Sequence, residues 1–355
     1  MTKPMRRERS KSLGLALIGI GLAAVALTRV QRGRRGYSFN GRSVVITGGS
    51  RGLGLVLARQ LAAEGALVTL VARDVRELET AVRHIQTRYP DAAVATAQAD
   101  VGNRLEVERA VADTVARFGR IDAVINNAGI IQVAPLDHMQ ESDYEDALRT
   151  HFWGPLSFTR AVLPHMRRQG GGTIVNISSI GGRIAVPHML PYSASKFALV
   201  GLSDGLRAEL AQDNIAVTTV CPGLMRTGSP VNASFKGKHE KEFEWFAVAS
   251  SLPLVTIGAE RAAAQIIRAA RRGDAELVIT PQAKAAIIAR TLAPELFSSV
   301  MAIVHRVLPR PAGPEGDVAQ PGRVAGAAWT SARALSPMRA AARKNNEWSN
   351  SRGTP

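Results

Sequence analysis

The chain has 355 residues, which is long enough to bury a sizeable hydrophobic core in one large domain or two small ones. Hydrophobic residues make up 46% of the chain and charged residues 21%, and these values exclude a mainly disordered or fibrous protein. The single cysteine, Cys221, excludes an internal disulfide framework and a multi-cysteine zinc or iron–sulfur site, so we expect no metal.

The formal net charge of +16 is concentrated at the two ends of the chain. Residues 1–36 contain nine Lys or Arg and one Glu, and residues 310–355 contain seven Lys or Arg and three acidic residues. The central part therefore has only a small positive excess. Basic ends of this kind are more typical of membrane flanks or solvated tails than of a groove for DNA, and we expect no nucleic-acid partner.

An uncharged apolar run, Leu13–Leu27, lies between two basic clusters near the N-terminus. With Thr28 to Val30 added, and with the flanking basic side chains snorkelling, it reaches the length of about 17 residues that a membrane-spanning helix needs. The alternative is a cleaved signal peptide with Ala24-Val25-Ala26 as the cleavage site, but the arginines that follow oppose translocation. We therefore expect an uncleaved membrane anchor at about residues 13–30.

From Ser43 onward, short β-branched runs alternate with longer amphipathic stretches. Crossovers of this length predict a parallel sheet covered on both faces, which is the doubly wound, Rossmann-type α/β class. The expected strands are Ser43–Thr47, Leu67–Ala72, Ala93–Gln98, Ile121–Ile125, Thr173–Ile177, Ile215–Val220 and Glu276–Thr280, and the expected helices are Gly54–Glu64 and residues 75–88, 103–118, 141–168, 192–212 and 259–272.

Three further zones complete the expected organisation. Residues 224–257 break the alternation and contain several aromatic residues among charges. An apolar stretch follows, with Pro294 suited to the first turn of a helix, and beyond Pro309 the composition turns to Pro, Ala, Gly, Ser and Arg without periodicity. We predict a basic N-terminus with the anchor (1–36), a catalytic domain (37–281), C-terminal apolar helices (282–309) and a disordered basic tail (310–355).

A glycine-rich turn directly follows the first expected strand and opens the first helix. Its residues are Thr47-Gly48-Gly49-Ser50-Arg51-Gly52-Leu53-Gly54. Glycines here let the backbone turn tightly and approach a pyrophosphate, which the helix N-terminus holds through free N–H groups and its dipole. An ordinary strand–helix loop is the alternative, but the position between strand and helix favours a dinucleotide site.

In a dinucleotide-binding fold, the residue at the end of the second strand contacts the adenosine ribose. An acidic residue there accepts the 2′-hydroxyl of NAD, whereas an arginine accommodates the 2′-phosphate of NADP. Here Arg73 comes first, and Arg51 in the glycine turn can reach the same phosphate. Asp74 is suited instead to capping the next helix. NADP is therefore favoured over NAD.

Tyr192 and Lys196 are four residues apart, so on a helix they share one face. A cationic amine near a phenol favours the phenolate, and we expect it to lower the pKa of the tyrosine towards working pH. Ser179, just past the end of an expected strand, is placed to present its hydroxyl to the same substrate oxygen. A surface helix pair is the usual alternative for Tyr-x-x-x-Lys, and it is disfavoured here because all these parts occur together.

The ordered motifs of residues 40–280 resemble those of the classical short-chain dehydrogenases/reductases. They are Thr47-Gly48-x-x-x-Gly52-x-Gly54, Asp100, Asn126-Asn127-Ala128-Gly129, Ser179, Tyr192-x-x-x-Lys196 and Pro222-Gly223-x-x-x-Thr227. The resemblance implies that Tyr192 is the general acid/base, that Lys196 binds the nicotinamide ribose and that Ser179 orients the carbonyl or alcohol. It further implies cofactor contacts from Asp100 and Val101 beside the adenine, from Asn127, Ala128 and Gly129 along the cofactor, and from Pro222, Gly223 and Thr227 at the nicotinamide end.

One position departs from the family pattern. Where the family has Asn-x-x-Gly, with an asparagine that supports a proton-relay water, this chain has His151-Phe152-Trp153-Gly154. An imidazole can also hold water and titrate near neutrality, so His151 is a candidate fourth catalytic residue. A tolerated packing substitution is the alternative.

These features favour an NADP(H)-dependent oxidoreductase that interconverts a secondary alcohol and a ketone on a small apolar substrate. The alternative is a membrane-tethered, cofactor-binding scaffold with little turnover, against which the complete set of Ser179, Tyr192 and Lys196 argues. We expect membrane lipid as a partner and leave a homo-oligomer open. Because NADPH is held in the cytosol and the lone cysteine offers no disulfide, we expect the catalytic domain to face the cytoplasm.

Overall fold

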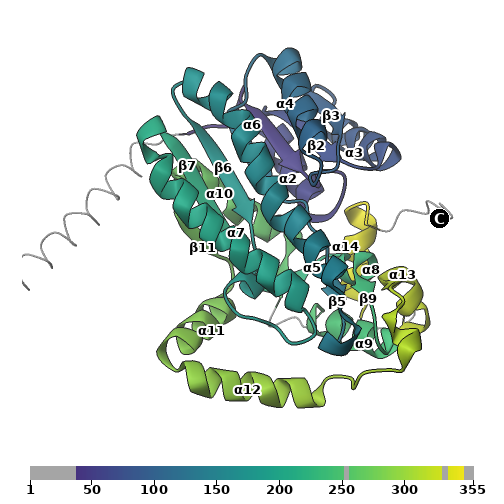
Figure 1. The fold of residues 1–355 in the computed structure, drawn as a ribbon. Helices are drawn as coiled ribbons and strands as arrows, with labels where there is room; N and C mark the ends of the chain where they lie inside the picture. Colours follow the sequence, from purple (N-terminus) through teal and green to yellow (C-terminus); the bar gives the residue numbers. More distant parts are fainter. Residues whose placement is uncertain (1–36, 252–255, 330–334, 348–355) are drawn as a thin grey trace, which may run out of the picture.

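A central sheet of seven parallel strands organises the molecule, in the order β11-β7-β6-β4-β1-β2-β3 (Figure 1). The computed structural model describes residues 37–251, 256–329 and 335–347. The strands are β1 (Ser43–Thr47), β2 (Leu67–Ala72), β3 (Val94–Gln98), β4 (Ala123–Asn126), β6 (Gly172–Ile177), β7 (Ile215–Cys221) and β11 (Glu276–Val278). The order reverses between β1 and β4, which is the doubly wound arrangement, and the predicted Rossmann-type class is confirmed.

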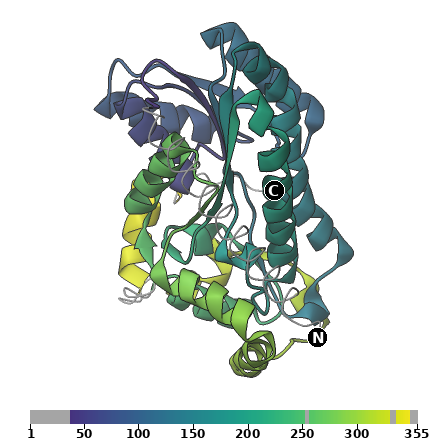
Figure 2. The same cartoon turned by 90° about the vertical axis from the view of Figure 1, so that its left-hand side faces the viewer.

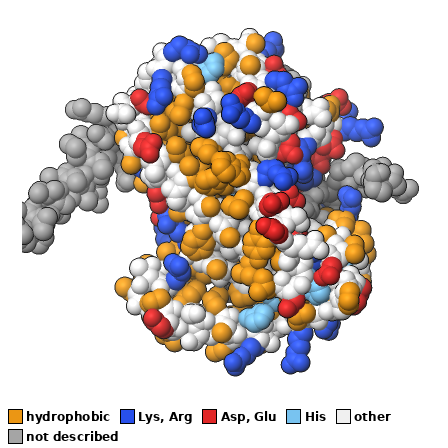
Figure 3. Space-filling view, viewed as in Figure 1, with side chains coloured by type: hydrophobic (Ala, Val, Ile, Leu, Met, Phe, Trp, Pro, Cys, Tyr) orange, Lys and Arg blue, Asp and Glu red, His pale blue; other side chains and the backbone are white. Residues whose placement is uncertain are grey.

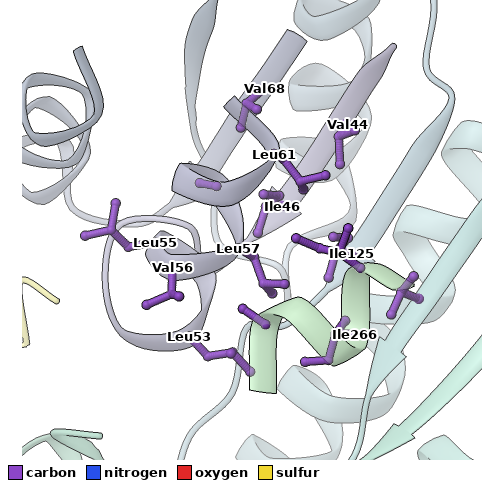
Figure 4. Close-up of a cluster of buried hydrophobic side chains, with 14 of the residues drawn as sticks. Val44, Ile46, Leu53, Leu55, Val56, Leu57, Leu61, Val68, Ile125 and Ile266 are labelled. Atoms are coloured by element: carbon purple, nitrogen blue, oxygen red, sulfur yellow. The ribbon is translucent and has the colours of Figure 1, made fainter. Parts of the chain in front are cut away.

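Helices cover both faces of this sheet. On one face lie α2 (Gly52–Ala63), α3 (Val75–Arg88) and α10 (Ala259–Arg272), and on the other α4 (Arg104–Phe118), α6 (Gly154–Arg168) and α7 (Leu190–Glu209). The strands form because β-branched and apolar residues occupy both of their faces; all five residues of β1 are buried. Figure 4 shows the first face of the core, where α2 places Leu53 and Leu57 between Ile46 of β1 and Ile266 of α10.

The region predicted as one helix over residues 141–168 is interrupted. Helix α5 (Glu141–Leu148) runs into a π-helical segment, Arg149–Trp153, before α6 begins at Gly154. The apolar pattern continues through this segment, so periodicity alone did not reveal it. Short π-helical insertions are frequent at functional sites, and this one contains His151.

The described residues of 224–251 and 256–258 form a small lobe beside the carboxyl ends of the central strands. Its elements are β8 (Met225–Arg226), α8 (Ser229–Asn232), β9 (Ser234–Phe235), α9 (His239–Ala249) and β10 (Ile257–Gly258), and β9 pairs with β5 (Gln132–Val133) and β12 (Gln320–Pro321). Phe235, Phe243 and Phe246 form a second hydrophobic core in this lobe. The remaining short turns of helix are η1 (Leu136–His138), η3 (Ile180–Gly182) and η4 (Ala211–Asp213).

The prediction of a disordered tail is wrong for the described part of residues 310–355. This part forms η5 (Pro314–Asp317), α13 (Gly322–Ala325), η6 (Ala327–Trp329) and α14 (Ser336–Lys344). Leu335 and Met338 are 1% and 2% exposed because they pack into the aromatic core of the small lobe. Gly322 lies so close to the carbonyl of Pro230 that a side chain would not fit. Small residues and a few apolar anchors therefore order a segment that has no helical periodicity over most of its length.

Helices α11 (Pro281–Leu292) and α12 (Pro294–Val307) occupy the stretch predicted as C-terminal apolar helices, and α12 begins at Pro294 as expected. They contact each other more than the body of the protein, and α12 runs along the lower edge of the molecule (Figures 1 and 2). Hydrophobic side chains remain exposed along the pair, namely Ile288, Leu292, Leu296, Val300, Ile303 and Val307.

The predicted membrane anchor, residues 13–30, lies outside the described residues. Within the described ranges, none of the helices combines the length and the apolar character that crossing a bilayer requires.

Candidate active site

A cavity of about 550 Å³ opens at the carboxyl ends of the central strands, next to the point where the strand order reverses. Its wall contains every residue predicted for the site except Gly54: Gly48, Ser50, Arg51, Gly52, Leu53, Arg73, Asp100, Val101, Asn127, Ala128, Gly129, His151, Ser179, Tyr192, Lys196, Pro222, Gly223 and Thr227. Residues from distant parts of the sequence thus meet in one cavity of the size that small-molecule and cofactor sites have.

The glycine turn between β1 and α2 has the geometry of a pyrophosphate cradle. Gly48 and Gly52 have φ values of +63° and +56°, in the left-handed region that favours glycine. Gly54 lines the back of the turn, where a Cβ would lie 2.0 Å from the carbonyl oxygen of Gly48. The turn is fixed from β4, since the Asn127 side-chain amide donates to the carbonyls of Thr47 and Gly48 at 3.0 and 3.2 Å. The backbone of the turn therefore has the shape and the N–H donors that suit a pyrophosphate.

The end of β2 supplies the expected arginine but also an unexpected carboxylate. Arg73 is exposed at the cavity, and Asp74 caps α3 by accepting from the backbone N–H of Glu77. Arg51 pairs with Glu77 at 2.7 Å, and the Ser50 hydroxyl donates to the same carboxylate at 2.9 Å. A 2′-phosphate at this end would have to compete with Glu77 for the Arg51 guanidinium. Glu77 was not predicted as a site residue, because acidic residues are common in the first turn of a helix.

Asp100 and Val101 follow β3 on the same wall. The Asp100 carboxylate accepts from the backbone N–H of Gly102 at 2.8 Å, while its own N–H donates to Glu106. Val101 is 8% exposed and packs against Gly154, where a Cβ would crowd it. These contacts fix the loop, and they leave the apolar side chain of Val101 on the wall, where it suits an adenine ring.

The three residues predicted for catalysis lie together. Ser179 caps the short helix η3, its Oγ accepting from the Gly181 backbone N–H at 3.0 Å, and it also hydrogen-bonds the Tyr192 side chain. Both Tyr192 and Lys196 are on α7, as their spacing predicts. The Lys196 ammonium donates to the carbonyl of Ile177 at 2.8 Å and lies 5.7 Å from the centre of the Tyr192 ring.

The titration of this group differs from the expectation of a lowered tyrosine pKa. Burial raises the pKa of Tyr192, and the hydrogen bond with Ser179 offsets this only in part. Burial also lowers the pKa of Lys196 to about 7, so its ammonium carries only part of its charge near neutral pH. The lysine therefore exerts less electrostatic effect on the phenol than a fully charged amine would.

His151 is fully buried and its two ring nitrogens are both engaged. Nε2 accepts from the backbone N–H of Ile130 at 3.1 Å, and Nδ1 lies 2.7 Å from the Ser195 hydroxyl, which itself donates to the carbonyl of Tyr192. This network requires the neutral tautomer with hydrogen on Nδ1. Burial, assisted by the Lys196 charge, holds the pKa of His151 well below its usual value. The contacts favour a packing and positioning role over a proton relay.

The turn after β7 closes the opposite end of the cavity. The Pro222 carbonyl accepts from the backbone N–H of Ile180 at 2.7 Å, which ties this turn to the Ser179 loop. Gly223 leaves room for Thr280, whose hydroxyl would lie 2.6 Å from a Cβ at that position. Thr227 is 3% exposed and its hydroxyl lies 2.7 Å from that of Ser229.

Sequence analysis missed two sets of cavity residues. One comes from the small lobe and the loop before α7, and includes Met189, Asn232, Phe246 and Ser250, which no motif marks. The other is Glu347, which enters the cavity from the end of the chain together with the backbone of Asn345 beside it. No local sequence pattern marks either set, because these residues reach the cavity only through contacts between distant segments.

Comparisons with known proteins agree with this site. The profile described as short chain dehydrogenase matches residues 42–236. A Mycobacterium tuberculosis protein named "Putative oxidoreductase SadH" is 35% identical over 275 residues, covering 77% of this chain and 98% of that protein. The 11-beta-hydroxysteroid dehydrogenase-like protein 4A of Arabidopsis thaliana is 39% identical over 192 residues, covering 54% of this chain and 63% of the relative.

The structural comparison gives the same result. The crystal structure of a gluconate 5-dehydrogenase from Burkholderia cenocepacia J2315, in complex with NADP and tartrate, matches with a TM-score of 0.60 at 29% identity, covering 70% of this chain and 97% of that one. The chain therefore belongs to the short-chain dehydrogenase family, whose fold binds NAD or NADP, and it is an oxidoreductase that acts on CH–OH groups.

Proposed function

We propose that this protein is an NADP(H)-dependent oxidoreductase that interconverts a secondary alcohol and a ketone on an apolar substrate. The observation that carries the proposal is the meeting of Ser179, Tyr192 and Lys196 with the glycine turn in one cavity. A cofactor cradle alone fits many proteins, but a phenol, a hydroxyl and a buried amine beside it fit carbonyl chemistry.

Each of these side chains has a role in moving or holding a proton. A nicotinamide cofactor supplies the hydride when it is bound. The Tyr192 hydroxyl gives its proton to the developing alkoxide in reduction and takes it back in oxidation. The Ser179 hydroxyl hydrogen-bonds the same oxygen and fixes the carbonyl. Lys196, with a pKa of about 7, holds the cofactor ribose and favours the phenolate in proportion to its charge.

The preference for NADP rests on the arginines at the end of β2. Arg73 is exposed at the cavity wall, and Arg51 reaches the same wall from the glycine turn. Two guanidiniums suit a 2′-phosphate, and no acidic residue occupies the ribose-reading position at the strand end itself. Glu77 weakens this preference without reversing it, because its carboxylate is shared between Arg51 and Ser50.

The apolar substrate is supported by the rest of the lining. Ile131, Met189, Leu224, Met225 and Phe246 face the cavity beyond the catalytic residues. They offer few hydrogen-bonding groups to a polyol or sugar. The relative named for an 11-beta-hydroxysteroid substrate agrees with a large apolar ketone.

Hydride transfer from NADPH to a panel of apolar ketones tests the proposal. Tyr192→Phe keeps the ring and removes the proton donor, so turnover should fall by at least about a hundredfold while NADPH affinity changes little. Tyr144→Phe, which alters a tyrosine outside the cavity, is the matched control. Near wild-type rates for Tyr192→Phe would refute the mechanism. Tight NADPH binding without turnover on any ketone would favour the cofactor-binding scaffold.

We further propose that the protein is anchored in a membrane by residues 13–30 with its catalytic domain in the cytoplasm, and that α11 and α12 lie on the lipid surface. The pair carries Lys284, Arg290 and Arg306 against one acidic residue, Glu295. Exposed apolar side chains among basic ones are typical of interfacial helices, and Figure 3 shows both kinds on the lower part of the molecule. Trp245 hydrogen-bonds Glu242 and Phe246 packs against Phe235, so these two aromatic side chains are engaged within the small lobe.

Membrane fractionation tests this location. Full-length protein should pellet with membranes and resist a high-salt wash, whereas a chain starting near Gly36 should lose this resistance and keep its cofactor site. Salt-extractable full-length protein would reduce the segment to an electrostatic tether. A mature chain beginning at Leu27 would identify a signal peptide.

A further inference from the structure

The end of the described chain lies inside the cofactor cavity. Helix α14 packs beside β8 (Figure 1). Residues 345–347 continue from this helix to the glycine turn, where they contact Ser50 and Gly52. Leu335 and Met338 anchor this helix in the aromatic core of the small lobe. The segment is thus held next to the site by contacts that do not involve the site itself.

Two hydrogen bonds join the segment to the glycine turn. The backbone N–H of Gly52 donates to the carbonyl of Asn345 at 2.9 Å. The side-chain amide of Asn346 donates to the carbonyl of Ser50 at 3.0 Å. Gly52 is the first residue of α2, so the N–H taken by Asn345 is one of the free donors that a helix N-terminus offers to a phosphate.

The Glu347 carboxylate occupies the space between the glycine turn and the turn after β7. It is 8% exposed, and its Oε2 accepts from the backbone N–H of Gly228 at 2.6 Å. Its Oε1 lies 3.0 Å from the position a Cβ would take at Gly52, on the side where the absence of a side chain lets a ligand approach. The side chain therefore puts an acidic oxygen pair against the backbone donors that suit a pyrophosphate.

A bound pyrophosphate and this segment compete for the same place. The segment takes the Gly52 N–H, which is one of the donors that the start of α2 would offer to a phosphate. A phosphate group close to Glu347 would also face a carboxylate in a buried setting, where repulsion is little screened. Arg51 acts electrostatically on Glu347 from the α2 side, but its guanidinium is already paired with Glu77. The segment must therefore move before a dinucleotide can lie along the turn.

We propose that residues 345–347 are an intramolecular inhibitor of cofactor binding, which occupies the pyrophosphate part of the cavity until a nucleotide displaces it. This inference rests on the proposed function in one respect, that the cavity takes a nicotinamide dinucleotide. It adds that the chain's own C-terminal segment sets the affinity for that dinucleotide.

Equilibrium binding of NADP⁺ to two altered proteins tests the inference. A chain that ends at Lys344 keeps α14 and its anchors but lacks the competing residues. The full-length double variant Asn346→Ala/Glu347→Ala removes the contacts without creating a new terminus near the site. In both, the Kd for NADP⁺ should fall by about tenfold or more, the scale expected when hydrogen bonds that hold a competitor are lost.

Glu315→Gln, at an exposed acidic position earlier in the same C-terminal region, is the charge-matched control and should leave the Kd unchanged. An unchanged Kd in both altered proteins would overturn the inference while leaving the cofactor site intact. Weaker binding in both would also overturn it, because the segment would then be part of the cofactor site. If neither the full chain nor the shortened one bound NADP⁺ or NAD⁺, the proposed function would fail and the inference with it.

Hydrogen exchange in the full-length protein provides a readout that does not depend on a variant. Saturating NADP⁺ should increase amide exchange in residues 345–347, because displacement releases the Asn345 and Glu347 contacts, while α2 becomes better protected. Increased protection of residues 345–347 on NADP⁺ binding would overturn the inference.

Discussion

The competition between Glu347 and the cofactor should depend on pH. Burial raises the pKa of Glu347 to about 7 from an ordinary value of 4.5, with the Gly228 hydrogen bond and Arg51 acting against the rise. When the segment is displaced, the side chain enters water and its pKa returns to the ordinary range. The docked segment therefore binds more protons than the displaced one between pH 4.5 and 7. Docking is strongest at low pH and weakens as the pH rises through 7.

The groups around Glu347 leave it as the main titrating site in this window. Arg51 lies on the α2 side, and the Gly228 N–H and the Asn232 amide, which face Glu347 from α8 and its N-terminal flank, do not titrate. On α14, Lys344 is paired with Glu260. The linkage relation then gives docking that is about tenfold stronger at pH 6 than at pH 8.

The assay is the ratio of two dissociation constants for NADP⁺, that of the full chain divided by that of the chain ending at Lys344. Titration of the 2′-phosphate and of the shared site residues cancels in this ratio. We expect the ratio to be about tenfold higher at pH 6 than at pH 8. Glu347→Gln in the full chain mimics the protonated form, so its ratio should be high and independent of pH. A wild-type ratio that is flat, or that rises towards pH 8, would refute the reasoning.

Five further substitutions test the cofactor end and the buried frame of the site. Arg73→Asp should raise the KM for NADPH strongly and the KM for NADH far less. Glu77→Gln should lower the KM for NADPH several-fold, because it frees the Arg51 guanidinium for the 2′-phosphate. Equal effects on both cofactors would show that Arg73 and Glu77 have only structural roles. His151→Asn should retain turnover if the histidine stands in for the family's asparagine. His151→Phe leaves the buried N–H of Ile130 without an acceptor and removes the donor to the Ser195 hydroxyl, so it should lower the free energy of unfolding by about 1–3 kcal/mol. Gly54→Ala forces a Cβ against the Gly48 carbonyl and should destabilise the fold by about 1–3 kcal/mol and abolish NADP⁺ binding; a fully stable, binding-competent variant would contradict the close approach.

The elements that were predicted correctly have local causes. The strand Ser43–Thr47 was identified to the residue because every side chain in it is buried, and the four residues after Ser43 are all β-branched. The face shared by Tyr192 and Lys196 follows from helical spacing alone. Most of the motifs follow predicted parallel strands, so they were expected to meet at the carboxyl ends of those strands.

The electrostatics of the site were less predictable. The expectation that Lys196 lowers the pKa of Tyr192 assumed a fully charged amine in a well-solvated setting. In the structure burial acts on both groups, and it disfavours the charged form of each. The pairing of Arg51 with Glu77 was equally invisible, because both residues also fit an exposed helix start. Depth of burial and choice of ion partner depend on the assembled fold.

The contacts of residues 345–347 with the glycine turn show most clearly why a sequence does not reveal contacts between distant segments. In the bond between Asn345 and Gly52 the backbone carbonyl of Asn345 accepts from the backbone N–H of Gly52, so any residue at position 345 could supply the acceptor and no residue type signals it. Around it, Arg343, Lys344 and Asn346 look like a solvated basic end. Glu347 alone is anomalous, as a carboxylate that is buried where the local sequence is basic and polar. A buried carboxylate must find donors, and in this chain the available ones belong to the backbone turns of the cofactor cradle. The same turns that make the cavity suitable for a dinucleotide therefore make it suitable for the end of its own chain, and occupancy by one must oppose occupancy by the other.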